Sequence, residues 1–229
     1  MKKIFSFRCL AVAAAVFMAT SAGADEAAIR KNLSERLPGF PKIDEVSKTP
    51  IPGLYEVRMG TDLLYTDEEG NHLIQGEIFD TRGQVNLTQA RVDKISAIDF
   101  ATLPLKDALV WKQGTGARKL VIFADPNCGY CKKLERDLQN VKDITVYTFL
   151  VPILGGDSPA KSRDIWCAKN SATVWRKWMI EGAEPPRSMA QCDTSALERN
   201  VALGQRHHVR ATPALVFEDG ARIAGLVPM

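Results

Sequence analysis

The feature that most restricts the fold of this chain is an apolar run that ends in a pair of closely spaced cysteines. Residues 119–125, KLVIFAD, have the continuous apolar pattern of a buried strand. Cys128 and Cys131 follow at once, and residues 131–141 have the periodicity of an amphipathic helix. The sequence therefore predicts two thiols, separated by two residues, at a strand-to-helix junction.

Around this junction, the second half of the chain alternates predicted strands and helices. Residues 144–151 predict a second buried strand, and an Asp219-Gly220 turn joins two further strands into a hairpin. Helical patterns fall between them, at residues 162–169, 172–179 and 194–205. A strand, a helix, a strand, several helices and a final hairpin predict an α/β fold with a mixed sheet.

The first 24 residues have the pattern of a secretory signal peptide. Lys2, Lys3 and Arg8 give a basic start, residues 9–19 form an apolar run, and small residues precede a cleavage site after Ala24. The run is shorter than the ~20 apolar residues of a membrane span, and no other segment approaches that length. We therefore expect the mature protein to be exported and soluble.

Removal of this segment changes the charge and the cysteine content. Of the 229 residues, 205 remain. The removed segment contains three of the 30 basic residues and no acidic one, so 27 basic residues are balanced by 27 acidic ones. Because this leaves no net charge and no basic stripe, we expect no nucleic-acid binding. Four cysteines remain, in a compartment expected to be oxidising: Cys128, Cys131, Cys167 and Cys192.

Residues 25–86 predict a small α+β unit. A helical pattern at residues 25–37 is followed by strand-like segments, separated by turns, at residues 43–49, 53–60, 61–67 and 72–80. A layer of roughly 60 residues has a thin core and often gains stability by pairing with a copy of itself. Residues 88–98, with Thr88 as the expected N-cap, predict a linker helix.

A CxxC pair can bind a metal, form a structural disulfide or carry out redox chemistry. Zinc sites use a second pair of ligands at matching spacing, which neither the other cysteines nor His207 and His208 supply. We therefore expect no metal. A bridge between Cys128 and Cys131 closes too small a loop to stabilise a fold by chain entropy.

The position of the pair favours redox chemistry. With Asn127 as N-cap, Cys128 lies in the first turn of the helix, where free N–H groups and the helix dipole stabilise a thiolate. Lys132 and Lys133 add positive charge. Such surroundings lower a cysteine pKa from ~8.5 to as low as ~3.5, which stabilises the dithiol form. We therefore interpret the pair as a redox site.

Several segments together resemble one known family. FADPNCGYCKKL, at residues 123–134, and ATPALVFEDG, at residues 211–220, resemble the thioredoxin-fold superfamily, most closely the periplasmic disulfide isomerases of the DsbC family. CGYC is the usual active-site tetrad of that family. IWCAKN, at residues 165–170, with the later Cys192 resembles its second disulfide, and residues 63–80 resemble its N-terminal dimerisation domain. The resemblance covers nearly all of the chain after the signal peptide.

The resemblance also implies roles for individual residues. Cys128 is the exposed nucleophile and Cys131 the resolving thiol. The substrate-binding residues are the following: Gly129, Tyr130, Thr212 and Pro213, with Pro213 in a cis peptide bond that exposes backbone groups of Thr212 beside Cys128. Tyr130 acts either through its N–H group, which proline lacks, or as an exposed ring that contacts substrates.

For the remaining pair, the resemblance implies a structural disulfide between Cys167 and Cys192. A bridge across about 25 residues contributes roughly 3 kcal/mol on the chain-entropy model. A second redox pair is the alternative, but nothing places either cysteine at a helix N-terminus with positive neighbours. We expect the structural role.

The domain organisation follows from the same resemblance. It implies a thioredoxin-like catalytic domain at residues 109–229, a dimerisation domain at residues 25–86 and a linker-helix region at residues 87–108. The family normally has a further C-terminal helix after the last strand, which this sequence does not contain. We expect either that the sequence is part of a longer chain or that the domain is trimmed.

The function implied is that of a periplasmic thiol:disulfide isomerase, a homodimer without a cofactor that repairs misfolded disulfide-containing proteins. Because isomerisation requires the dithiol, the resemblance also implies a membrane thiol reductase of the DsbD type as a partner. The alternatives are a thiol oxidase, a DsbG-like protein that protects single cysteines, and a holdase chaperone with incidental cysteines. Replacement of both active-site cysteines discriminates them, because only a holdase keeps its effect on aggregation.

Overall fold

The structure, a computed structural model, describes residues 22–188 and 191–225, which divide into one unit ending at Ile78 and a second beginning at Phe79. The predicted signal peptide, apart from its last three residues, lies outside the described residues. No helix within the described residues combines the length and apolar character needed to cross a membrane.

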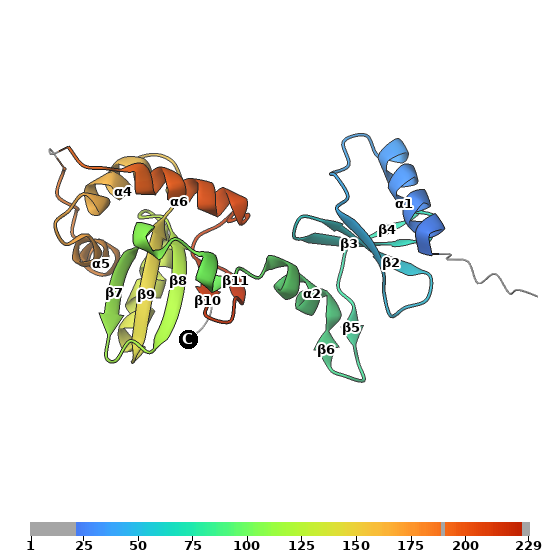
Figure 1. Cartoon of the computed structure of the whole chain (residues 1–229), viewed down its shortest axis with the longest axis horizontal. Coiled ribbons are helices and arrows are strands. Elements are labelled where there is room, and N and C mark those ends of the chain that lie inside the picture. Colours follow the sequence, from blue (N-terminus) through green and yellow to red (C-terminus); the bar gives the residue numbers. More distant parts are fainter. Residues whose placement is uncertain (1–21, 189–190, 226–229) are drawn as a thin grey trace, which may run out of the picture. The chain divides into compact units, whose positions relative to one another are not determined.

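The first unit packs one helix against a four-stranded antiparallel sheet of strand order β1-β2-β3-β4. Its elements are α1 (Ala22–Arg36), β1 (Glu45–Lys48), β2 (Leu54–Met59), β3 (Asp62–Asp67) and β4 (Leu73–Ile74) (Figure 1). Ile29 and Leu33 lie one turn apart on α1 and are buried in the same cluster as Tyr55 and Val57 of β2. The core of this unit is therefore one helical stripe against one sheet face.

The strand predicted at residues 72–80 is divided in the structure. Only Leu73–Ile74 pairs with β3, whereas Phe79–Asp80 (β5) forms a separate hairpin with Val85–Asn86 (β6) in the second unit. Residues 71–77 are all exposed, so no packing partner supports a continuous strand there. The prediction of one long strand was wrong for this reason.

The second unit contains a five-stranded mixed sheet with helices on both of its faces. Its remaining elements are α2 (Leu87–Ser96), β7 (Leu109–Gln113), β8 (Arg118–Ala124), α3 (Gly129–Asp137), β9 (Ile144–Leu150), α4 (Ser158–Trp166), α5 (Ser171–Glu181), α6 (Ser195–Arg206), β10 (Ala214–Phe217) and β11 (Arg222–Ala224), with short 3₁₀ helices at Phe100–Thr102, Leu105–Asp107 and Leu138–Asn140. The strand order is β11-β10-β8-β9-β7, and only the β8–β9 pair is parallel. This is the mixed sheet that the sequence predicts.

The central strand β8 is buried on both faces because consecutive side chains point to opposite sides of a sheet. Ile122 packs in the cluster that contains Leu134 of α3 and Trp175 of α5. Phe123 packs in the other cluster, with Leu203 of α6. The continuous apolar pattern of β8 thus reflects a strand covered by helices on both sides.

The helix predicted from residue 88 begins one residue earlier. α2 starts at Leu87, and the Asn86 side chain accepts a hydrogen bond from the Gln89 N–H at 2.9 Å. Asn86 is therefore the N-cap, and Thr88 lies inside the first turn. Asn is as strong an N-cap as Ser or Asp, and it outranks Thr.

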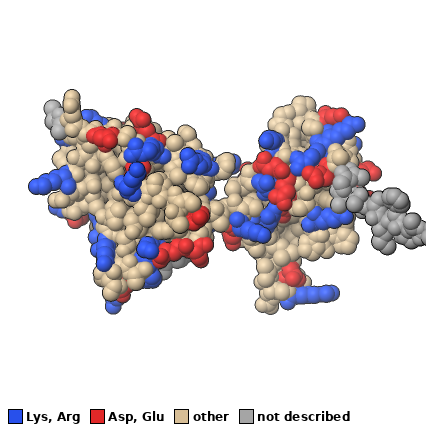
Figure 2. Space-filling view, viewed as in Figure 1, with Lys and Arg blue, Asp and Glu red and all other residues tan. Residues whose placement is uncertain are grey.

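Charged side chains of both signs are dispersed over the face of each unit that Figure 2 shows. Wide areas of uncharged residues separate them on this face.

Replacement of Phe123 by alanine tests the layered core of the second unit. Phe123 is fully buried and stacks on Phe149 with ring centroids 5.3 Å apart. We expect Phe123→Ala to lower the free energy of unfolding by about 3–5 kcal/mol. Tryptophan fluorescence in urea measures this unit alone, because all four tryptophans lie in it. Val110→Ala, at an exposed site, is the control and should change the value by less than about 0.5 kcal/mol; an equal effect of both changes would contradict the prediction.

Candidate active site

The two cysteines of CGYC lie at the carboxyl end of β8, and both are reduced and buried. Cys128 precedes α3 as its N-cap: its Sγ accepts a hydrogen bond from the Cys131 N–H at 3.3 Å. Only 5% of the Cys128 surface and 1% of the Cys131 surface are exposed. The nucleophile proposed from the sequence is therefore less accessible than expected.

The expectation that Asn127 caps this helix was wrong. The Asn127 side chain instead donates from Nδ2 to Asp157 Oδ1 at 2.6 Å and to Ser158 Oγ at 2.8 Å. These bonds hold Asn127 to the start of α4, so its amide does not reach the free N–H groups of α3. The sulfur of Cys128 takes the capping position in its place.

The Thr212–Pro213 peptide bond is cis and lies beside Cys128. Cys128 Sγ and Thr212 O are 3.1 Å apart, a distance at which the protonated thiol donates to the carbonyl. The sheet explains this proximity, because Ala214 of β10 pairs with Phe123 of β8. The structure thus brings together the residues that the sequence separated by more than 80 positions.

The pKa of Cys128 is lowered to about 5. The largest cause is the hydrogen bond from the Cys131 thiol, and burial opposes it by favouring the neutral form. The Thr212 side chain and the backbone N–H groups of Cys131 and Tyr130 lower the pKa further. At neutral pH, Cys128 is therefore a thiolate, the reactive form of cysteine.

The pKa of Cys131 moves in the opposite direction. Its hydrogen bond to Cys128 is the largest cause of the raised value, followed by burial and by the negative charge on Cys128. Cys131 therefore stays protonated while Cys128 is ionised. At neutral pH the pair therefore holds one proton. This proton is on Cys131, the more deeply buried of the two residues.

Lys132 and Lys133 do not have the role expected from the sequence. The Lys132 ammonium lies 3.8 Å from the centroid of the Trp178 ring, and burial lowers its pKa. Lys133 forms an exposed ion pair with Asp137 at 2.9 Å. The low pKa of Cys128 rests mainly on hydrogen bonds rather than on these charges.

Gly129 and Tyr130 form the exposed part of the motif. The Tyr130 side chain is 65% exposed, and a Cβ atom placed on Gly129 would meet no heavy atom within 4 Å. Both interpretations of Tyr130 from the sequence have a physical counterpart, since its N–H lowers the pKa of Cys128 while its ring is open to solvent. An approaching chain finds free space on this side of Cys128.

Sequence reasoning missed the residues that position the loop before Cys128. Asp125 is fully buried and accepts hydrogen bonds from the Asn127 N–H, the Leu154 N–H and the Ser158 hydroxyl, each at 2.8–2.9 Å. Trp178 donates from Nε1 to the Pro126 carbonyl at 2.6 Å. The acidic residue directly after an apolar strand was a signal in the sequence that could have identified Asp125, but it was not used.

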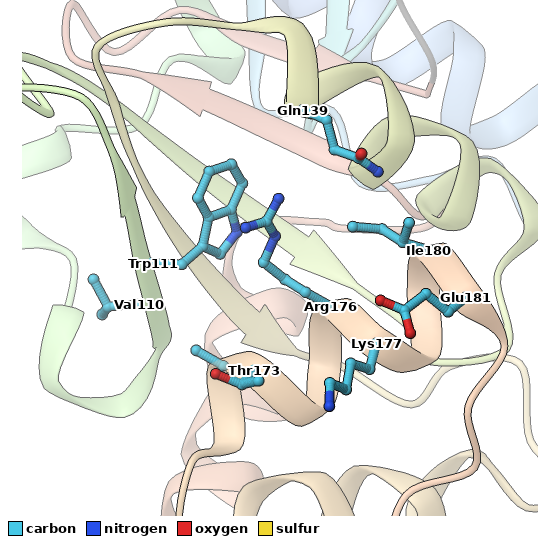
Figure 3. A pocket seen from close by; sticks show the side chains of 9 residues that line it. Val110, Trp111, Gln139, Thr173, Arg176, Lys177, Ile180 and Glu181 are labelled. Atoms are coloured by element: carbon cyan, nitrogen blue, oxygen red, sulfur yellow. The ribbon is translucent and has the colours of Figure 1, made fainter.

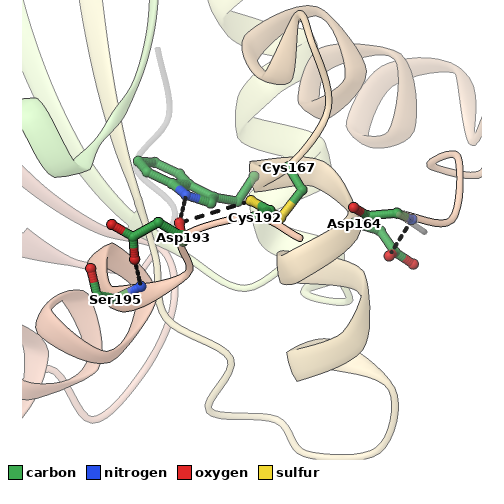
Figure 4. Close-up of a disulfide and its surroundings, with 7 residues drawn as sticks. Asp164, Cys167, Cys192, Asp193 and Ser195 are labelled. Atoms are coloured by element: carbon green, nitrogen blue, oxygen red, sulfur yellow. Dashed lines mark hydrogen bonds between the residues drawn. A yellow bond between two sulfur atoms is a disulfide. The ribbon is translucent and has the colours of Figure 1, made fainter. Parts of the chain in front are cut away.

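A disulfide joins Cys167, at the end of α4, to Cys192 (Figure 4). Next to it, the Asp193 carbonyl accepts from Trp166 Nε1 at 2.9 Å, and the Asp193 carboxylate accepts from the Ser195 N–H at 2.9 Å. The bond therefore connects α4 to the chain that enters α6. The structural role of this bridge stays a prediction.

A cavity of about 440 Å³ opens between β7 and α5, and none of the predicted site residues lines it (Figure 3). In its wall, the Arg176 guanidinium lies 4.2 Å from the centroid of the Trp111 ring. Glu135 of α3 is buried beside Arg176 and accepts from Trp175 Nε1 at 2.6 Å. Burial raises the pKa of Glu135. These contacts attach α3 to α5.

The charge on Cys128 can be measured by alkylation of the reduced protein at different pH values. We expect the rate to reach half its maximum near pH 5 and to fall as the thiolate is protonated below that value. Cys131→Ala removes the main cause of the low pKa, so the midpoint should rise toward the ~8.5 of an ordinary cysteine thiol. Lys132→Met is the control and should leave it unchanged; a rise as large as that of Cys131→Ala would show that charge, not hydrogen bonding, lowers the pKa.

The disulfide is tested by replacing both of its cysteines. We expect Cys167→Ala with Cys192→Ala to lower the free energy of unfolding by roughly 3 kcal/mol, because the bridge closes a loop of 25 residues. Urea unfolding followed by tryptophan fluorescence measures this loss. The pH profile of Cys128 alkylation should stay the same. A shifted profile would mean that the bridge acts on the redox site.

Comparison with known families agrees with the two units. The family described as the disulfide bond isomerase protein N-terminal domain matches residues 20–89. The family described as the thioredoxin-like domain matches residues 105–229, more than half of the chain.

Curated proteins match most of this chain, and a solved structure matches part of it. "Probable thiol:disulfide interchange protein DsbC" of Bordetella parapertussis is 45% identical over 201 residues, which cover 88% of this chain and 70% of that protein. "Thiol:disulfide interchange protein DsbC" of Escherichia coli is 32% identical and covers 100% of this chain and 92% of its own length. A crystal structure of a disulfide interchange protein from Neisseria gonorrhoeae matches with a TM-score of 0.52 and 35% identity, over 56% of this chain and 91% of that one. The chain belongs to the DsbC family and has its N-terminal domain and its thioredoxin-like domain.

Proposed function

We propose that this protein is a thiol:disulfide isomerase in which Cys128 is the nucleophile. The observation that carries the proposal is the position of Cys128: its Sγ caps α3 by accepting from the Cys131 N–H at 3.3 Å and lies 3.1 Å from the carbonyl of Thr212, the residue before the cis proline. These surroundings lower the pKa of Cys128 to about 5 and raise that of Cys131. In the first step, the Cys128 thiolate attacks one sulfur of a wrong disulfide. A mixed disulfide forms, and the other substrate sulfur leaves as a thiolate.

The mixed disulfide can then be resolved by two routes. A different substrate thiolate can attack the substrate sulfur, which releases Cys128 as a thiolate and creates a new substrate disulfide without net oxidation. Alternatively, Cys131 attacks Cys128, the substrate leaves reduced, and the two cysteines become a disulfide. The low pKa of Cys128 makes it a good leaving group in the first of these routes.

The same geometry keeps the Cys131 thiol unreactive until a substrate is bound to Cys128. Two of the causes of its raised pKa are the hydrogen bond to Cys128 and the charge on Cys128. Formation of the mixed disulfide removes that charge and weakens that bond. The pKa of Cys131 then falls, so the resolving thiol becomes reactive only after a substrate is attached.

Thr212 supports the binding of an extended substrate. The Thr212 carbonyl accepts a hydrogen bond from Cys128 when the Cys128 thiol is protonated. The Cys128 thiolate has no proton to donate, so this bond is lost on ionisation. With Cys128 ionised, the carbonyl is free to accept an N–H from a substrate chain. The buried Thr212 hydroxyl makes no hydrogen bond to the described residues and is available to the thiolate.

We propose a periplasmic location, a homodimer and a membrane thiol reductase as the reducing partner. The signal-peptide pattern and the Cys167–Cys192 disulfide support an oxidising, exported environment. In the first unit, Leu73 and Ile74 of the sheet-edge strand β4 are exposed, which supports pairing with a second copy. A reductase is required because each resolution by Cys131 leaves the pair oxidised.

The function is tested with a protein that carries several scrambled disulfides, in a glutathione buffer. We expect the mature chain to restore the activity of this substrate and Cys128→Ala to abolish the effect. Cys131→Ala should keep part of it, because substrate thiols can still resolve the mixed disulfide. The outcome that contradicts isomerase function is rapid oxidation of a reduced substrate while the scrambled one stays scrambled, as expected of an oxidase.

A further inference from the structure

We propose that residues 151–157, between β9 and α4, form a substrate-contact loop. In this loop, Ile153 and Leu154 bind large apolar side chains that flank the cysteine under attack. The inference rests on the proposed function, and it names the class of client sequence that the site prefers.

The first observation is the exposure of apolar side chains in this loop and in the CGYC motif. Ile153 is 42% exposed and Leu154 is 58% exposed, and Tyr130 of CGYC is exposed too. From β7 to the end of the described residues, only Val110 is a further large apolar side chain of this exposure. Single exposed apolar residues are ordinary, but a concentration of them marks an interaction surface.

The sheet places this loop on one flank of Cys128. β8 and β9 are parallel, and Ala124 at the end of β8 pairs with Leu150 at the end of β9. Pro213 precedes β10, on the opposite side of β8. Neighbouring strands are about 4.8 Å apart, so a chain lying across this edge meets Thr212 on one side of Cys128 and the loop on the other.

Hydrogen bonds hold the loop in place next to the motif. The Val151 N–H donates to the Ala124 carbonyl at 2.9 Å, and the Leu154 N–H donates to Asp125 Oδ2 at 2.9 Å. The other oxygen of the Asp125 carboxylate accepts from the Asn127 N–H, one residue before Cys128. The backbone that carries the two exposed side chains is therefore held in place before a substrate arrives, which lowers the entropic cost of binding.

The chemistry of the loop selects an apolar occupant. Residues 151–156, VPILGG, carry no charge. The charged residue of the loop, Asp157, accepts from Asn127 Nδ2 at 2.6 Å and pairs with Lys161 at 3.3 Å, so its charge is already engaged within the protein. Because Cys128 is 5% exposed, only an extended segment can bring a disulfide to its sulfur. Cysteine is among the residue types most often buried in a protein core, where its neighbours are apolar. In a misfolded client, such a cysteine is exposed together with these apolar neighbours.

The test uses two peptide disulfides that differ only in the residues flanking the cysteine, leucine in one and serine in the other, with equal net charge. The rate constant for reaction with the full reduced chain gives a ratio of leucine to serine peptide. We expect a preference of about tenfold for leucine in the unchanged protein. Ile153→Ser with Leu154→Ser should bring the ratio close to one, and Ile153→Gln with Leu154→Gln gives a second, bulkier variant. Val110→Ser, at a side chain 44% exposed on the edge strand β7, is the matched control and should keep the full ratio.

The outcomes separate this inference from the proposed function. If the unchanged protein reacts with both peptides at equal rates, or if both loop variants keep the preference, the substrate-contact loop is overturned while the isomerase proposal stands. If it reacts with neither peptide, both are overturned. The pH profile of Cys128 alkylation checks that each variant retains an intact redox site.

Discussion

The contact between the two cysteines is the interaction on which the redox site depends: the Cys131 thiol is the largest cause of the low pKa of Cys128, and the Cys131 N–H donates to the same sulfur. A helix begins with free N–H groups that need an acceptor, and an oxygen from Ser, Thr, Asp or Asn normally supplies it. Here the acceptor is the sulfur that carries the reactive charge. Helix formation and thiolate formation therefore stabilise each other. An oxidised pair would offer α3 only a neutral sulfur, so the same bond stabilises the dithiol form that isomerisation requires.

Two buried carboxylates fix the helix that carries this sulfur. Asp125 holds the loop in front of α3 through three hydrogen bonds, and Glu135 within α3 accepts from Trp175 of α5. Buried carboxylates are costly unless they are hydrogen-bonded, and both are placed where a single acid satisfies groups from a neighbouring element. Cys128 can therefore exchange partners during the reaction while its backbone stays in one place.

The sequence predicted the family, the mixed sheet and the strand-to-helix position of CGYC, because periodicity and motif spacing are local properties. It predicted the wrong cap for α3, since the alternative partners of Asn127 at α4 lie 30 positions further along the chain. The buried roles of Asp125 and Glu135 were missed for a related reason. From sequence alone, an acidic residue is expected at the surface. It can be assigned to the interior only when its hydrogen-bond donors are known, and those donors come from other elements of the fold. Residue roles at the site stay predictions, as do the domain boundaries at residues 86 and 108.

The disulfide between Cys167 and Cys192 has a consequence for how the molecule itself is made. Four cysteines follow residue 24, and four cysteines joined in two pairs have three possible arrangements. The observed bond leaves Cys128 and Cys131 as free thiols, although they precede Cys167 and Cys192 in the chain and are therefore made first. The bond between Cys167 and Cys192 has to form in the presence of two other thiols of the same chain.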